Sequence, residues 1–203
     1  MTRSSLINSI LFVTLSSLSL LTAGPALALI EGELSVGNRT GDFSEKSLSG
    51  TTIQVAGHLD PIPLVPVSFG VRVINDTFNP TVADHSMKSL SATAVVPEVA
   101  AWFPFGDIKP FARLVYTLVS AYKGTMEATV LGSTVSGDVA FKSTGVRMAA
   151  GVNYSILPLI ALSAAFEQST EKLSVSEKLA GVTIESDFDF KNTALIVGIK
   201  AGI

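Results

Sequence analysis

Apolar and polar residues alternate with a period of two along most of the chain after residue 28. The clearest example is GVRMAAGVNYSILPLIALSAAFEQS, residues 145–169. Its even positions are almost all apolar up to residue 156, whereas the odd positions are small or polar and include Arg147 and Asn153. After a Leu-Pro-Leu turn the alternation resumes, with Glu167 on the polar side. Successive side chains of a β-strand point to opposite faces, so this segment predicts a hairpin with one wholly apolar face.

The same alternation predicts six further strands, which gives eight in all. They are expected near residues 30–37, 51–59, 66–74, 90–105, 108–120 and 194–203.

The segment 90–105 changes phase at Pro97. Its apolar positions are even up to Val96 and odd from Val99 onward. Proline cannot donate a hydrogen bond to a strand ladder and is found at edges or bulges. The sequence therefore predicts a β-bulge at Pro97, which would place Glu98 on the polar face.

The connections between the predicted strands alternate in kind. One set is short and apolar or proline-rich: LDPIPLVP, FPFGDIKP and SILPL. The other set is long and polar: GNRTGDFSEKSLSG, NDTFNPTVADHSMKS, residues 121–144 and residues 168–191. The last two long connections alternate themselves and are expected to extend their strands as hairpins. Short turns at one end and long loops at the other are typical of a transmembrane β-barrel.

The N-terminus carries the three parts of a secretory signal peptide. Arg3 precedes an apolar stretch over residues 7–21, and Ala26-Leu27-Ala28 provides small residues for cleavage after Ala28. A permanent membrane anchor is the alternative, but Pro25 and several serines disfavour a spanning helix. We therefore expect residues 1–28 to be a signal peptide and residues 29–203 to form the barrel.

Composition excludes several classes of function. The net charge of −3 gives no basis for binding nucleic acid, and the absence of cysteine excludes disulfides, thiolate catalysis and cysteine metal sites. Glu185, Asp187 and Asp189 alternate near the C-terminus but lack the spacing of a calcium loop. The sequence predicts no catalytic residue, no metal site and no cofactor.

With its signal peptide, its eight alternating strands and its end at the last strand, the chain resembles the small outer-membrane β-barrels of the OmpA-barrel and OmpX type. Gly198 and Ile203 match the terminal signature of that family, whereas Ile196 stands where a polar residue is usual. The resemblance implies an all-β, eight-stranded antiparallel up-and-down transmembrane β-barrel with short periplasmic turns and long extracellular loops. It also implies a monomer in the outer membrane of a Gram-negative bacterium. Its partners would be outer-membrane lipid, lipopolysaccharide and, through the C-terminal strand, the barrel assembly machinery.

In such a barrel the polar face points inward, and eight strands leave an interior just wide enough for side chains. We expect Arg147 to pair with Glu167 across a five-residue turn, and Glu98 with Arg113. Four acids and four bases are thereby predicted to form a lumen charge network. They are Glu31, Glu33, Arg72, Glu98, Arg113, Arg147, Glu167 and Lys200.

The period alone does not decide which face is outside, because a soluble lipocalin-type barrel has the same alternation with the faces swapped. Three features favour the membrane version: the asymmetry of the connections, the small residues on the polar face, and aromatic residues near the strand ends. These aromatics are Trp102, Phe103, Phe105, Tyr116 and Tyr154.

The only histidines are His58, on the predicted polar face, and His85, in the loop string Asp-His-Ser. Neither arrangement has the context of a catalytic site. We therefore expect a non-enzymatic outer-membrane barrel with a charge-plugged lumen, acting in envelope integrity or surface interaction through its loops. The alternatives are a narrow pore or a small-molecule or lipid-binding barrel and, third, a lipid-modifying outer-membrane enzyme.

Overall fold

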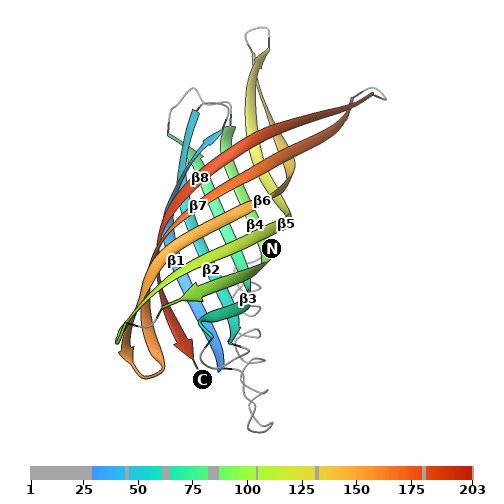
Figure 1. Cartoon of the computed structure of the whole chain (residues 1–203). Helices are drawn as coiled ribbons and strands as arrows, with labels where there is room; N and C mark the ends of the chain where they lie inside the picture. Colours follow the sequence, from blue (N-terminus) through green and yellow to red (C-terminus); the bar gives the residue numbers. More distant parts are fainter. Residues whose placement is uncertain are drawn as a thin grey trace, which may run out of the picture.

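The computed structural model describes residues 29–43, 46–60, 65–81, 87–103, 105–130, 133–179 and 182–202, and the predicted signal peptide lies outside them. Eight strands account for nearly all of these residues (Figure 1). They are β1 (Leu29–Phe43), β2 (Lys46–Asp60), β3 (Val67–Pro80), β4 (Met87–Trp102), β5 (Ile108–Val130), β6 (Ser133–Leu157), β7 (Ile160–Leu179) and β8 (Val182–Gly202).

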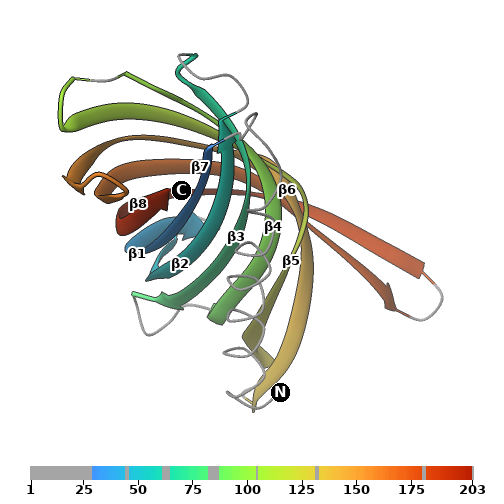
Figure 2. The same cartoon turned by 90° about the horizontal axis from the view of Figure 1, so that it is seen from below.

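Each strand pairs antiparallel with the next along the chain, and β1 closes the barrel by pairing with β8. The ring is visible when the molecule is viewed from below (Figure 2). In the closing ladder Leu34 lies opposite Ile199, and Val36 lies opposite Val197. This confirms the predicted eight-stranded up-and-down barrel. Among the described residues, no helix is long and apolar enough to cross a membrane.

The alternation of the sequence separates the two faces of the barrel wall. Apolar side chains such as Val71, Leu114 and Ile199 are about half exposed on the outside, whereas Arg72 and Glu98 are buried inside. A soluble barrel would bury its apolar face, so this arrangement excludes the lipocalin-type alternative and favours a lipid-facing wall. Of the predicted interface aromatics, only Trp102 faces inward, where Lys109 Nζ lies 5.8 Å from its ring centre.

The predicted bulge at Pro97 is wrong. The register between β3 and β4 runs unbroken from Val67 opposite Ala101 to Phe78 opposite Leu90, so no residue is inserted there. Val95 and Pro97 face outward, whereas Val96 faces inward. The apolar set that was expected to face lipid instead packs inside the barrel. Ala94 and Val96 pack there with Ile74 and Val115, whereas Leu90 and Ala92 belong to a larger apolar cluster.

The bulge lies on β5 instead. Between Thr117 and Ser120, three residue steps of β5 oppose two of β6, so β5 carries one extra residue. The inward positions of β5 change accordingly from odd (Thr117) to even (Ser120, Tyr122). The ladder between β4 and β5 is interrupted from Thr93 to Glu98 for the same reason, and Pro97 lies within this interruption. A proline there disrupts little, because the ladder is already broken.

The two ends of the barrel differ as the connections predict. At one end the turns are tight: Gly106, with φ of 62°, and Asp107 link the bridge between Phe105 and Ile108. At the other end the strands continue into the last two long connections as hairpins, as the alternation of those segments predicts. Residues 133–141 of β6 pair only with β5, and residues 182–190 of β8 pair only with β7. Two hairpins therefore project beyond the rim (Figure 1).

Candidate functional site: the interior of the barrel

The part of the interior nearer the tight turns holds a layer of ion pairs built on Arg72. Its Nη2 lies 3.0 Å from Glu33 Oε2 and 3.1 Å from Glu98 Oε1, so that one guanidinium joins acids of β1 and β4. Arg113 Nη1 approaches the same Glu33 at 3.4 Å. All four side chains are buried, and a buried charge is tolerated only when it is paired.

His58 completes this layer. Its Nε2 contacts the Glu98 carboxylate. Gly70 lies opposite His58 on β3, and a Cβ at Gly70 would come within 2.7 Å of the imidazole Cδ2. A side chain at Gly70 would therefore clash with the imidazole and with the backbone oxygen of Gly57. His58 therefore lies on the inner face, as predicted, and has a specific partner there, whereas His85 lies outside the described residues.

A second layer of charges lies farther toward the projecting hairpins. Arg147 binds Asp76 with an Nη1–Oδ2 distance of 2.8 Å and Glu171 with an Nη2–Oε1 distance of 2.7 Å. Arg39 contacts Glu167 and lies 3.3 Å from Asp76. Every acid of this layer therefore faces a guanidinium.

Arg113 connects the two layers. Its Nη1 reaches Glu33 in the first layer, and its Nη2 lies 3.2 Å from Glu167 Oε2 in the second. Gln54 adds a second link, because its Oε1 accepts a hydrogen bond from Arg72 at 3.0 Å and its Nε2 donates a long one to Glu167 at 3.5 Å. The charges thus form one continuous network across the interior.

The structure brings the eight predicted residues into the interior, but several pairs differ from the expected ones. Arg147 lies opposite Ser169, two residues from Glu167, because the turn between β6 and β7 has two residues and not five. Arg147 Nη1 still approaches Glu167 Oε1 at 3.8 Å. The shorter turn alone would shift the register by three residues, but an irregularity between Ser155 and Leu157 reverses one of them. The net shift of two preserves the inward face.

The expected pair of Glu98 with Arg113 is replaced. Glu98 lies opposite Val115 and binds Arg72 and His58, whereas Arg113 binds Glu33 and Glu167. At the rim, Lys200 contacts Glu31 of β1. These long side chains therefore pair with residues across the interior more often than with residues on the neighbouring strand of the same hairpin.

Sequence reasoning missed three members of the network, Arg39, Asp76 and Glu171, because they lie in segments interpreted as loops. A signal was present: each has the same parity as an inward residue of its own strand. Arg39 follows Glu33, Asp76 follows Arg72, and Glu171 follows Glu167 by an even number of residues. Extending the period beyond the predicted strand ends would have found them.

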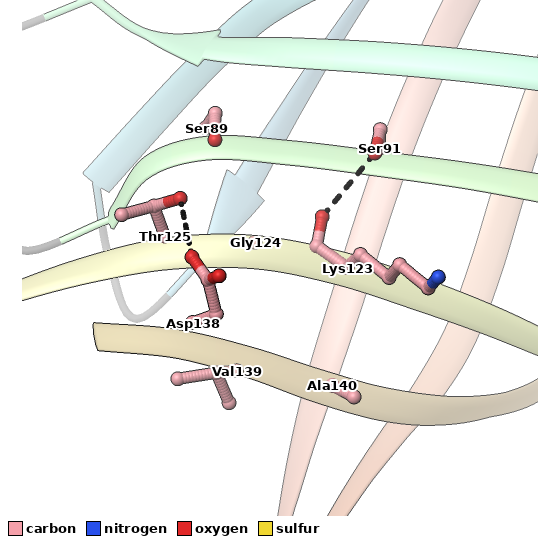
Figure 3. A pocket seen from close by; sticks show the side chains of 8 residues that line it. All are labelled: Ser89, Ser91, Lys123, Gly124, Thr125, Asp138, Val139 and Ala140. Carbon is pink, nitrogen blue, oxygen red and sulfur yellow. Dashed lines mark hydrogen bonds between the residues drawn. The ribbon is translucent and has the colours of Figure 1, made fainter. Parts of the chain in front are cut away.

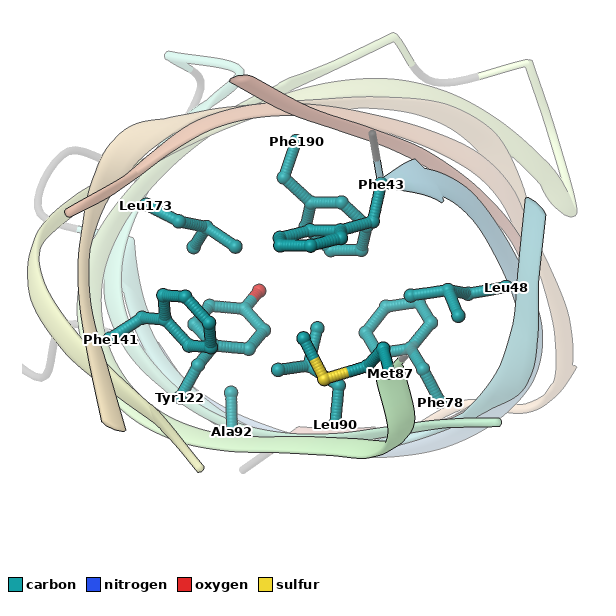
Figure 4. Close-up of a cluster of buried hydrophobic side chains, with 10 residues drawn as sticks. All are labelled: Phe43, Leu48, Phe78, Met87, Leu90, Ala92, Tyr122, Phe141, Leu173 and Phe190. Carbon is teal, nitrogen blue, oxygen red and sulfur yellow. The ribbon is translucent and has the colours of Figure 1, made fainter. Parts of the chain in front are cut away.

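Above the ion pairs, apolar side chains point from the wall into the interior and form a buried cluster (Figure 4). The ring of Phe190 packs edge-on against Phe78 with 5.1 Å between centroids, and against Tyr122 at 6.0 Å. The hydroxyl of Tyr122 donates a hydrogen bond to Glu171 at 2.9 Å, which joins this cluster to the charges. We call these ten buried residues the apolar plug. They are Phe43, Leu48, Phe78, Met87, Leu90, Ala92, Tyr122, Phe141, Leu173 and Phe190.

A cavity of about 20 Å³ lies beside Glu33, His58 and Lys200, which is room for about one water molecule. Within the described part of the chain, no three histidine, aspartate or glutamate residues are grouped so as to hold a metal ion. The arrangement can pair charges and fill space.

A closed eight-stranded wall with an apolar exterior and a charge-paired interior defines the fold of the small outer-membrane β-barrels. The Neisserial surface protein A shares it, with a TM-score of 0.58, 14% identity, and coverage of 85% of this chain and 96% of that one. The outer-membrane protein AlkL, solved in lipid bilayers, gives a TM-score of 0.54 at 11% identity over 90% of this chain and 93% of that one.

OprG, an outer-membrane protein of Pseudomonas aeruginosa, gives a TM-score of 0.51 at 10% identity over 89% of this chain and 98% of that one. At these identities the likeness establishes the fold, and it confirms the resemblance seen in the sequence. No protein-family model and no curated protein matches the chain.

Proposed function

We propose that this protein is a non-enzymatic barrel of the outer membrane of a Gram-negative bacterium, with a closed lumen. It would be exported by a signal peptide cleaved after Ala28, and it would act in envelope integrity or surface interaction through the hairpins at its outer end. The observation that carries the proposal is that two sets of buried side chains fill the interior. The buried network of ion pairs fills one half, and the apolar plug fills the other.

The outer wall supports the location. Side chains such as Val99, Leu114 and Met148 lie side by side on the outside and are about half exposed, which is costly in water and favourable in lipid. The partners that follow are outer-membrane lipid, lipopolysaccharide and, through β8, the barrel assembly machinery. We propose a monomer, because a closed barrel leaves no unpaired strand in the wall for a second copy.

A narrow pore or a small-molecule or lipid-binding barrel is the second candidate. One observation favours it: Val139, Val175 and Phe188 of the projecting hairpins pack on the apolar plug and remain only partly buried. A lipid-modifying enzyme has less support, because His58 is buried against Glu98, where no substrate reaches it.

Fractionation combined with a heat-modifiability gel tests the proposal. The protein should be found in the outer-membrane fraction, should begin at Leu29, and should migrate differently in SDS before and after boiling. A known soluble periplasmic protein serves as the control for the fractions. Recovery in the soluble fraction, with one mobility before and after boiling, would refute the outer-membrane assignment.

A further inference from the structure

An open hollow of about 440 Å³ lies on the outer face of the barrel wall, over β4, β5 and β6 near the projecting hairpins (Figure 3). Ser89 and Ser91 come from β4, Lys123 and Thr125 from β5, and Asp138 from β6. The volume is within the range of sites that hold small molecules or sugar units. This hollow belongs to neither the ion-pair network nor the apolar plug.

The hollow is formed by irregular strand pairing. Between Met87 and Ser89, β4 advances two residues while β5 advances one, and the ladder between the two strands is interrupted again beyond Thr93. Such irregularities bend a strand and redirect its side chains. The regular stretch between them, where Ser91 lies opposite Lys123, presents its side chains to the outside.

The position of the hollow along the wall restricts what can reach it. Below it, Val95 and Leu118 are outward-facing and more than 60% exposed, as expected of residues in contact with lipid chains. From Thr93 upward the outward residues of β4 are polar. The hollow therefore begins where the apolar wall ends, which corresponds to the headgroup layer of a membrane around this barrel.

The side chains offer both hydrogen-bond donors and acceptors. Lys123 is exposed and forms no ion pair with any described residue. Asp138 accepts one hydrogen bond, from Thr125 at 3.2 Å, and its carboxylate can accept more. Ser91 donates weakly to the Lys123 carbonyl at 3.4 Å, and its hydroxyl oxygen can still accept. Hydroxyl groups and a carboxylate suit sugar hydroxyls, whereas a free ammonium suits a phosphate.

We propose that this hollow binds a phosphorylated sugar, with Lys123 on the phosphate and with Asp138 and the serine hydroxyls on the sugar. The phosphorylated sugar is either the headgroup of an outer-leaflet glycolipid or a soluble molecule. The inference rests on the proposed outer-membrane location, because that location sets the hollow at headgroup height.

The test uses the full mature protein folded in detergent micelles, and it measures binding by native mass spectrometry. The probes are purified lipopolysaccharide, the same lipopolysaccharide after removal of its phosphates, and soluble glucosamine phosphate. The variants are Lys123→Gln and, as a matched control, Lys142→Gln. Lys142 is also exposed and lies opposite Ala121, at nearly the same height but outside the hollow.

We expect Lys123→Gln to weaken binding of the phosphorylated probe by roughly fivefold or more, since a charge-assisted contact is lost. Lys142→Gln should bind like the wild type, and the dephosphorylated lipopolysaccharide should bind the wild type as weakly as the intact one binds Lys123→Gln. If glucosamine phosphate shows the same dependence on Lys123, the site takes the soluble sugar; if only lipopolysaccharide does, it takes the glycolipid.

Equal effects of the two lysine variants, or binding that does not depend on phosphate, would overturn the inference. Heat-modifiability of each variant shows that the barrel is folded. A heat-modifiable barrel that fails this test leaves the proposed function standing, whereas a protein absent from the outer membrane contradicts the proposed function itself.

Discussion

Arg147 on β6 and Asp76 on β3 form an ion pair of 2.8 Å across the interior, although their strands are not neighbours in the barrel. Both side chains are fully buried. A pair of this kind ties opposite walls together, which hydrogen bonds between adjacent strands do not do. Removing either partner leaves the other charge buried without its partner.

Alanine at Arg147 should lower the free energy of unfolding by about 3–5 kcal/mol, because Asp76 and Glu171 lose their closest positively charged partner. The double variant Arg147→Ala/Asp76→Ala should lose clearly less than the sum of the two single variants. Denaturant titration in lipid vesicles measures these values. The coupling of Arg147 with Glu167 should be weaker, because the atoms are 3.8 Å apart and Glu167 retains Arg39 and Arg113.

The exposed pair of Lys172 with Asp187, at 3.2 Å, serves as the control for this cycle. Its two alanine variants should be additive, because water screens the pair. Additive losses at Arg147 and Asp76 would mean that the buried contact does not stabilise the fold, although the barrel itself would be unaffected by that result.

A charge on the lipid-facing wall should be poorly tolerated. Leu114→Arg should cost roughly 2–4 kcal/mol of unfolding free energy if Leu114 lies near the bilayer midplane. Ser136→Arg is the matched control, because Ser136 is exposed on the projecting part of β6. Equal tolerance at the two positions, measured by refolding yield into vesicles, would contradict the assignment of the lipid-facing wall.

The alternation of the sequence predicts the strands and the faces of this barrel well, because one inward residue fixes the direction of every second neighbour. It fails where the same apolar pattern fits both a lipid-facing and an inward-facing set of residues. Val96 has the apolarity of a lipid-facing residue, yet it faces inward, because an interior this narrow also needs apolar side chains to fill it. The bulge on β5 is not predicted either, because no proline or glycine occurs at residues 117–120 to indicate it.

Ion-pair partners follow even less from the sequence. Arginine side chains reach across the lumen, so the neighbour on the next strand is only one of several acids within reach. Arg113 binds Glu33 of β1 and Glu167 of β7, and neither β1 nor β7 is adjacent to β5. Parity predicts that a residue points inward, and only the three-dimensional arrangement identifies its partner.

The turn at Gly106 should require glycine. Its φ of 62° is disfavoured for other residues, and a Cβ there would contact no other atom, so any loss reflects backbone conformation alone. Gly106→Ala should lower the unfolding free energy by about 1 kcal/mol. Gly137→Ala, where a Cβ also meets nothing and φ is not positive, should be neutral. Equal stabilities of the two variants would argue against this turn geometry.

The apolar plug should contribute substantially to stability. Phe190→Ala removes a ring that packs against Phe78, Tyr122 and Phe43, and should cost about 3–5 kcal/mol. Phe166→Ala is the control, because Phe166 is on the outer wall and 54% exposed, and it should lose less. Unfolding titrations compare the two. A larger loss at Phe166 would mean that the hairpin ends do not pack as described.

Conductance in planar bilayers tests most directly whether the lumen is closed. The interior holds the ion-pair network and the apolar plug one above the other. The cavity beside Glu33, His58 and Lys200 has room for about one water molecule. Purified, heat-modifiable wild-type protein should therefore give no steady single-channel currents under an applied voltage. Steady, reproducible unitary currents from the wild type would contradict the closed lumen and establish the barrel as a pore.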